Sequence, residues 1–185
     1  MSPDQVYPPR EDTYLLARAA ISEAGESDFV LEVGTGSGYI ARSLQESGIR
    51  VLATDINPHA VKAARSEGLD VVRTDLFMGI RGPFDLVVFN PPYLPTRAEE
   101  RIDDWLECAL DGGPDGRSVI RQFAEEVSGH LSPGGRVLIL VSSVTGFEEV
   151  MALFRKQGFQ VDIYQKERVY DEDLVVLKCS MKTGG

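Results

Sequence analysis

Short apolar segments alternate along this chain with longer segments in which apolar residues recur every three or four positions. Continuous apolar runs of about four to eight residues indicate buried strands, whereas the longer spacing is typical of helices that bury one face. The pattern predicts strands at Phe29–Val33, Val51–Thr54, Val71–Val72, Phe84–Phe89, Arg136–Val141, Gln160–Lys166 and Leu174–Cys179. It predicts helices at Tyr39–Glu46, Pro58–Glu67, Ser118–His130 and Phe147–Gln157.

The order of these elements indicates the fold class. Strands that alternate with helices form a parallel sheet that is covered on both faces. Only a turn near residues 170–173 separates the last two strands, so we expect them to pair as an antiparallel hairpin at one edge. The pattern therefore predicts one α/β domain over residues 1–185, built on a doubly wound, seven-stranded and mostly parallel sheet.

Composition and charge narrow the function classes. The two cysteines, Cys108 and Cys179, lie far apart and lack metal-ligand spacing, so we expect neither a disulfide framework nor a bound metal, and a cytoplasmic location. No segment approaches the ~20 apolar residues of a membrane helix, so we expect no membrane association. The formal net charge is −10, which disfavours nucleic acid as a partner because such binding depends on Lys and Arg neutralising phosphates.

The first strand leads into a glycine-rich loop, Gly34-Thr35-Gly36-Ser37-Gly38, and then directly into a helix. Glycines let the backbone turn tightly and approach a ligand closely, although a tight turn alone would also use them. A nicotinamide site would require glycine at position 39, where this chain has Tyr39. Glu32 would repel a pyrophosphate, whereas it suits a ligand with an ammonium and a sulfonium centre.

Acidic residues follow the next two strands. Asp55 can accept hydrogen bonds from two ribose hydroxyls, although it could instead cap the following helix in competition with Asn57. Asp75 can accept a hydrogen bond from an adenine amino group while Leu76 covers the ring, although a turn residue would also fit this position. Since the carboxyl ends of parallel strands meet at one edge, the three acidic residues together indicate an adenosyl cofactor.

The fourth strand runs straight into Asn90-Pro91-Pro92-Tyr93. The two prolines fix two φ angles and hold the loop rigid. The Oδ1 atom of Asn90 and the carbonyl of Pro91 can accept the two hydrogens of a planar NH2 group, while Tyr93 stacks on its plane. This arrangement orients the nitrogen lone pair toward a methyl donor and stabilises the charge that develops on nitrogen. We therefore predict that Asn90, Pro91 and Tyr93 are catalytic; a proline turn that leaves a strand is the alternative.

An Asn-Pro-Pro-Tyr motif after a glycine-rich cofactor loop resembles the signature of amino methyltransferases that act on exocyclic or amide nitrogens. Two further segments, Val6–Leu16 and Ala109–Gly116, resemble the HemK-type protein-glutamine N5-methyltransferases of class-1 release factors, in their compact archaeal and eukaryotic branch. The resemblance covers essentially the whole chain. It implies the class I methyltransferase (Rossmann-like) fold, the cofactor S-adenosyl-L-methionine, and methylation of the glutamine in the Gly-Gly-Gln motif of a translation release factor.

The resemblance also implies specific residues and partners. The implied cofactor-binding residues are Thr13, Glu32, Gly34, Gly36, Gly38, Asp55, Ile56, Asp75, Leu76 and Asn90. A class-1 peptide release factor is the implied protein substrate. A small zinc-binding activator subunit is the implied partner, and the third strand with its flank, Leu69–Arg73, is its candidate docking edge.

Two other substrates stay open. Adenine-N6 methylation of nucleic acid uses the same catalytic loop, but it normally requires a basic face or a target-recognition domain. Methylation of a protein lysine would require a base to deprotonate the ammonium, and Asn90 is not a base. The polar connection at residues 94–117 is long enough to predict a functional loop. Its charged residues could contact a protein substrate, although a solvated helix face explains them better.

Overall fold

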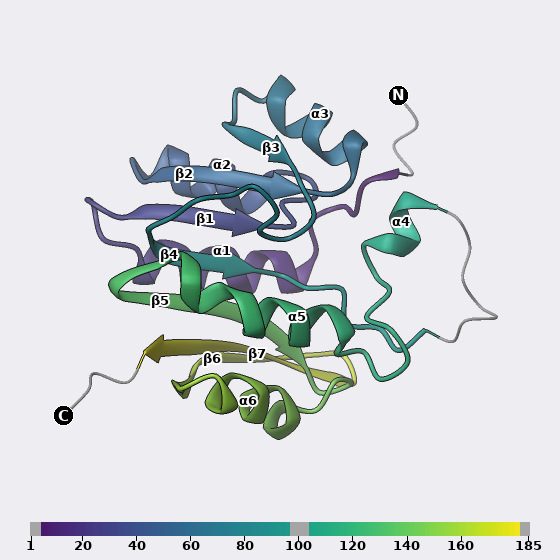
Figure 1. The fold of residues 1–185 in the computed structure, drawn as a ribbon. Helices are drawn as coiled ribbons and strands as arrows, with labels where there is room; N and C mark the ends of the chain where they lie inside the picture. Colours follow the sequence, from purple (N-terminus) through teal and green to yellow (C-terminus); the bar gives the residue numbers. More distant parts are fainter. Residues whose placement is uncertain (1–4, 97–103, 182–185) are drawn as a thin grey trace.

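A central mixed sheet carries the fold (Figure 1), as the computed structural model of this chain describes it over residues 5–96 and 104–181. The strand order in this part of the chain is β3-β2-β1-β4-β5-β7-β6. The strands are β1 (Phe29–Val33), β2 (Arg50–Asp55), β3 (Val71–Arg73), β4 (Phe84–Phe89), β5 (Leu131–Ser142), β6 (Phe159–Val169) and β7 (Glu172–Met181). The helices are α1 (Glu11–Glu23), α2 (Tyr39–Glu46), α3 (Pro58–Ser66), α4 (Trp105–Cys108), α5 (Ser118–Glu126) and α6 (Phe147–Lys156).

The sheet changes winding direction between β1 and β4. From β1 the chain adds β2 and then β3 on one side, and it returns to place β4 on the other side of β1. The strands β1 to β5 pair in parallel, and β7 pairs antiparallel with both β5 and β6. The predicted fold class, with its antiparallel C-terminal hairpin at one edge, is therefore confirmed. In such sheets a crevice forms at the carboxyl ends of the two strands that flank the change of direction.

Helices cover both faces of the sheet (Figure 1). On one face α1, α2 and α3 pack against strand residues that include Val30, Ala53 and Leu86. On the other face α5 and α6 pack against residues that include Leu31 and Val87. Because both faces are buried, the central strands are almost continuously apolar, as the sequence pattern indicated.

The helix α1 was absent from the predicted elements. Its buried positions include the polar residues Asp12 and Thr13 beside Leu15, Leu16 and several alanines. A helix whose buried side mixes charged and apolar residues lacks a simple apolar stripe, which is the pattern that sequence analysis detects. Along the described residues, no helix has both the length and the apolar character needed to cross a membrane.

Other boundaries differ by a few residues. The predicted helix Ser118–His130 ends at Glu126 and continues as one 3₁₀ turn. β5 begins at Leu131 rather than Arg136, and its register with β4 shifts between Phe84 and Leu86. The predicted loop at residues 94–117 contains the short helix α4, and residues 97–103 of that loop lie outside the described residues.

Candidate active site

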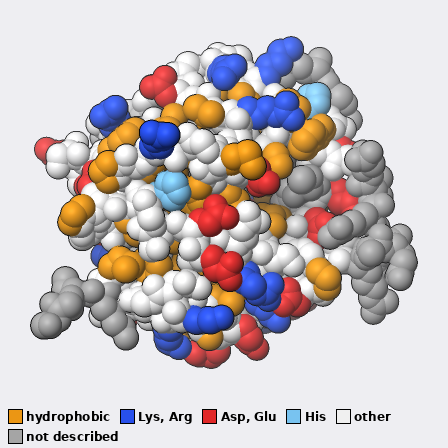
Figure 2. Space-filling view, viewed as in Figure 1, with side chains coloured by type: hydrophobic (Ala, Val, Ile, Leu, Met, Phe, Trp, Pro, Cys, Tyr) orange, Lys and Arg blue, Asp and Glu red, His pale blue; other side chains and the backbone are white. Residues whose placement is uncertain are grey.

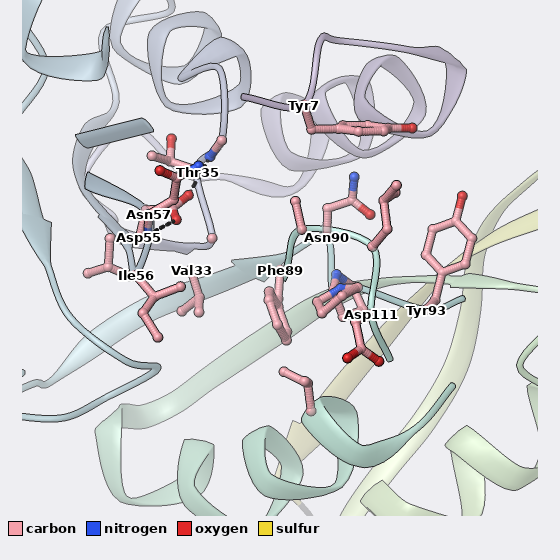
Figure 3. A pocket seen from close by; sticks show the side chains of 18 of the residues that line it. Tyr7, Val33, Thr35, Asp55, Ile56, Asn57, Phe89, Asn90, Tyr93 and Asp111 are labelled. Atoms are coloured by element: carbon pink, nitrogen blue, oxygen red, sulfur yellow. Dashed lines mark hydrogen bonds between the residues drawn. The ribbon is translucent and has the colours of Figure 1, made fainter. Parts of the chain in front are cut away.

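A cavity of about 470 Å³ opens at the carboxyl ends of β1 and β4. Its position follows from the register of the sheet, because Val33 pairs with Phe89 and the next residues, Gly34 and Asn90, therefore leave the sheet side by side. The volume lies in the usual range of ~300–1,000 Å³ for small-ligand sites. Figure 3 shows Asp55 and Ile56 at one end of this cavity and Asn90 and Tyr93 at the other.

The glycine-rich loop forms the wall next to β1. Gly34 and Gly36 line the cavity, and both have positive φ angles, 67° and 53°. A Cβ atom at Gly34 would also lie only 3.4 Å from the Phe89 ring. Gly38 is not among the lining residues. Its φ of 78° begins α2, and a Cβ there would lie 2.9 Å from Leu69 Cδ1, so we expect Gly38 to shape the loop rather than to contact a ligand.

Glu32 lies at the bottom of the cavity and is 2% exposed. Its Oε2 atom accepts hydrogen bonds from the Thr35 hydroxyl at 2.6 Å and from the Ala41 N–H at 3.0 Å. Burial raises the pKa of Glu32 to about 8, although these two donors act in the opposite direction. A buried carboxyl group of this kind favours a cationic group of a ligand, because such a group would stabilise its ionised form.

Replacing Glu32 with glutamine is expected to change how the stability of the ligand-free protein depends on pH. The folded protein holds the Glu32 proton up to a pKa of about 8, whereas the unfolded chain releases it near 4.5. The free energy of unfolding therefore falls as the pH rises between these values, with a slope from this group that approaches about 1.4 kcal/mol per pH unit. Glu32→Gln should remove that part of the slope.

Urea denaturation at roughly pH 5 and roughly pH 8 measures this difference. The matched control is Glu46→Gln at an exposed position of α2, which should keep the wild-type slope. An unchanged slope in Glu32→Gln would contradict the raised pKa.

Asp55 ends β2 and is 9% exposed at the cavity wall. Its oxygens accept hydrogen bonds from the N–H groups of Gly36 at 2.7 Å and of Asn57 at 2.8 Å. Burial raises the pKa of Asp55, and these N–H groups oppose the rise. Asp55 does not cap α3, since the side chain of Asn57 accepts the hydrogen bond from the His59 N–H. The carboxylate thus supports the glycine-rich loop, and each of its oxygens can accept a further hydrogen bond.

Asp75, Leu76 and Ile56 form the far end of the cavity. Asp75 is exposed, so its carboxylate can accept a hydrogen bond from a ligand without a large desolvation cost. Leu76 is buried with a φ of 42°, which is rare for a residue with a branched side chain. This conformation turns the chain directly after Asp75. An apolar and an acidic side chain therefore lie together, as expected for a site that binds a planar heterocycle.

The tetrapeptide Asn90-Pro91-Pro92-Tyr93 forms the opposite end. Asn90, Pro91 and Tyr93 line the cavity, with Tyr7 facing Asn90 (Figure 3). The Asn90 Oδ1 atom is buried and has no hydrogen-bond partner among the described residues. An unpaired buried acceptor costs about 1–3 kcal/mol, so its retention indicates a ligand that donates to it. Burial, with the nearby charges of Asp12 and Glu172, raises the pKa of Tyr93, so its hydroxyl stays protonated and does not act as a base at neutral pH.

Asp12 and Tyr7 line the same cavity and were missed by the sequence analysis. The Asp12 Oδ2 atom accepts hydrogen bonds from Asn90 Nδ2 at 3.2 Å and from the Tyr7 hydroxyl at 3.4 Å. Burial, followed by the charge of Asp12, raises the pKa of Tyr7 to about 12. Thr13 also lines the cavity, and its hydroxyl bonds to Asp12 Oδ1 at 3.2 Å. The only sequence signal for Asp12 was its position next to Thr13.

A second glycine-rich segment, residues 110–116, contacts the chain at Tyr93 and Leu94. The backbone of Leu94 accepts a hydrogen bond from Gly112 and donates one to Leu110. The backbone of Gly116 lies close to that of Tyr93, because a Cβ atom at Gly116 would lie 2.5 Å from the Tyr93 carbonyl oxygen. Residues 110–116 therefore position the loop that contains Tyr93 and Leu94.

Comparisons with known proteins agree with this geometry. The family model of the methyltransferase small domain matches residues 12–105. A Methanocaldococcus jannaschii protein that carries the name protein N5-glutamine methyltransferase is 38% identical over 94% of this chain and 90% of its own length. Methyltransferase HEMK2 of Mus musculus is 36% identical over 95% of this chain and 89% of its own length.

One solved structure has a similar fold along almost the full length of both chains. It is the E. cuniculi Mtq2-Trm112 complex, which is responsible for the methylation of the translation termination factor eRF1. Its matching chain is 32% identical, with a TM-score of 0.80, and the match covers 96% of this chain and 99% of that chain.

Proposed function

Because this chain belongs to the HemK-type protein N5-glutamine methyltransferases, we propose that it methylates the side-chain amide nitrogen of the glutamine in the Gly-Gly-Gln motif of a translation release factor. The observation that carries the proposal is the buried Oδ1 atom of Asn90, a residue that lines the cavity. This atom has no partner in the described part of the chain. A primary amide supplies the two N–H donors that such an acceptor and the neighbouring Pro91 carbonyl need.

The residues of the cavity fit S-adenosyl-L-methionine as the methyl donor. The buried Glu32 suits its cationic amino-acid end, and the positive φ angles of Gly34 and Gly36 let the backbone of this loop line the cavity in a conformation that other residues rarely adopt. Asp55 would accept the ribose hydroxyls, and Asp75 with Leu76 and Ile56 would hold the adenine. When bound, this cofactor supplies an electrophilic methyl group.

The residues of this chain contribute orientation and charge stabilisation to the transfer. An amide nitrogen is a poor nucleophile because its lone pair is delocalised. When Asn90 Oδ1 and the Pro91 carbonyl accept its two hydrogens, the lone pair is aimed at the methyl group and the developing positive charge is stabilised. Tyr93 offers an aromatic face to the plane of the amide. The proton becomes acidic once the nitrogen is positively charged, so it can leave without a dedicated base.

The two alternative substrates fit the described residues less well. A lysine ammonium must first lose a proton, and the raised pKa of Tyr93 makes its hydroxyl a poor candidate for the base. Adenine in nucleic acid would bring phosphates to a chain whose net charge is −10. Both alternatives are separate outcomes of the experiment below.

The test is transfer of labelled methyl groups from S-adenosyl-L-methionine to a recombinant class-1 release factor and to its variant with alanine in place of the Gly-Gly-Gln glutamine. We expect label in the first protein and none in the second. Equal labelling of both would contradict the glutamine assignment. Labelling of lysine, located by peptide mass spectrometry, or of bare RNA or DNA would replace it with the corresponding alternative.

We also propose a Trm112-type activator as a partner, docked at the free edge of β3. The relative from E. cuniculi was solved as a complex with Trm112. Val72 is 40% exposed in the middle of β3, and among the described strands β3 pairs only with β2. A small hollow lined by Lys62, Arg65 and Arg73 lies beside it. Figure 2 shows Lys and Arg gathered toward the top of the molecule, where Figure 1 places α3 and β3.

Val72→Asp is expected to weaken binding of a recombinant Trm112-type subunit at least about tenfold, because it places a charge on an apolar contact at the centre of the interface. Isothermal titration measures the affinity. The matched control is Ile163→Asp, which changes an exposed apolar residue on β6 at the opposite edge of the sheet. If both variants bind the subunit equally well, the β3 docking edge is wrong.

A further inference from the structure

A buried carboxylate contacts the catalytic amide from outside the tetrapeptide. Asp12, in the first turn of α1, is 4% exposed, and its Oδ2 atom lies 3.2 Å from Asn90 Nδ2. The two residues are 78 positions apart in the sequence, so the fold alone brings them together. The proposed reaction involves Asn90, but it leaves the role of this carboxylate unexplained.

The chemistry of the pair determines which way the amide faces. An ionised carboxylate only accepts hydrogen bonds, whereas an amide has a donor side and an acceptor side. Asn90 must therefore present Nδ2 to Asp12. Its Oδ1 atom then faces away from Asp12, and it is the buried atom that has no partner among the described residues. Without Asp12, rotation of the amide by half a turn would place a donor where the substrate needs an acceptor.

The carboxylate is itself held in place. Its Oδ1 atom accepts hydrogen bonds from the Thr13 N–H at 2.6 Å and from the Thr13 hydroxyl at 3.2 Å. The Tyr7 hydroxyl donates to Oδ2 at 3.4 Å. Asp12 also lies at the N-terminal end of α1, where the helix dipole favours a negative charge. These contacts fix the direction in which the carboxylate accepts hydrogen bonds.

We propose that Asp12 is a positioning residue that holds the Asn90 amide with Oδ1 toward the substrate nitrogen; this rests on the proposed function. Its negative charge also polarises the amide, which makes Oδ1 a stronger acceptor as positive charge develops on the substrate. Asp12 acts through Asn90, so its loss should lower kcat and leave the affinity for S-adenosyl-L-methionine nearly unchanged.

The experiment exchanges the two side chains. In Asp12→Asn the amide of Asn90 can adopt either orientation, so kcat should fall about tenfold, which is the value of about one hydrogen bond. In Asn90→Asp two carboxylates face each other and activity should fall further. In the double variant D12N/N90D, the new amide at position 12 can donate to the new carboxylate at position 90, whose other oxygen still accepts from the substrate. We expect the double variant to be at least about tenfold more active than Asn90→Asp alone.

The control is Glu11→Gln, which removes the same charge from the same turn of α1 at an exposed position and should keep the wild-type kcat. A double variant no more active than Asn90→Asp, or a loss in Glu11→Gln equal to that in Asp12→Asn, would overturn the proposal. Failure of the proposed function looks different, because wild-type protein would then not label the release factor. A substrate-independent readout covers that case: the Asn90 side-chain NH2 resonances, assigned from their loss in Asn90→Asp, should shift in Asp12→Asn and not in Glu11→Gln.

Discussion

Replacing Asn90 with alanine is expected to lower kcat for release-factor methylation by about 10²–10³-fold, the effect of removing one preorganised polar group that stabilises charge in a transition state. The Oδ1 atom of Asn90 is buried without a partner among the described residues, in a side chain that lines the cavity, and alanine offers no acceptor in its place. Binding of S-adenosyl-L-methionine should be largely retained, because most of the proposed cofactor contacts come from β1, β2 and the segment after β3.

Steady-state kinetics with labelled cofactor gives kcat, and isothermal titration gives the cofactor affinity of the same preparation. Thermal unfolding checks the fold, since Asp12 loses the hydrogen bond from Asn90 Nδ2 in this variant. Activity of the folded variant above a tenth of the wild-type value would show that the amide does not provide the main stabilisation of the transition state.

Gly116→Ala is expected to have the second-largest effect, although no side chain is removed. The φ of Gly116 is 71°, and a Cβ atom there would lie 2.5 Å from the Tyr93 carbonyl oxygen and 3.1 Å from Thr145 Cγ2. Steric strain and the unfavourable φ should together lower the free energy of unfolding by about 2–4 kcal/mol. The Tyr93 backbone must also move, and a displacement of about 1 Å in a catalytic group can cost up to about 10²-fold in rate.

The matched control is Gly68→Ala. Gly68 has a similar φ of 78°, but a Cβ atom there meets nothing within 4 Å, so this variant reports the cost of the backbone conformation alone. It should lose about 1 kcal/mol of stability and no activity. Urea denaturation and kcat are compared for both variants. Equal losses of activity would mean that contact with the tetrapeptide is not what Gly116 provides.

Much of the fold was predictable because its strands are buried on both faces. Their apolar runs stand out in the sequence. Only a turn separates the last two strands, and this indicated the antiparallel hairpin. The helix α1 was missed because Asp12 and Thr13 are buried among its apolar residues. Polar residues inside a helix usually indicate an exposed face, and only tertiary structure shows that this face contacts a site.

The candidate site was predictable where a side chain that can bind a ligand lies at the carboxyl end of a predicted strand. Glu32 is the residue before the end of β1, Asp55 ends β2 and Asn90 follows β4. The structure brings all three to one cavity. Asp12 was not predictable in this way, because an acidic residue in the first turn of a helix is common for its effect on the helix dipole alone. Its contact with Asn90 depends on how α1 crosses the sheet, which no local pattern encodes.

The change of winding between β1 and β4 has a consequence for protein engineering. The residues proposed to hold the cofactor come mainly from the chain before Ile80, whereas the acceptor loops at residues 90–96 and 110–116 all come later. A chimaera could therefore join the first half of this chain to the second half of a methyltransferase with another target. The hydrogen bond from Asn90 to Asp12 crosses that junction. A graft that aims to redirect the enzyme must therefore transfer residues 7–13 together with the new loop at residues 90–96.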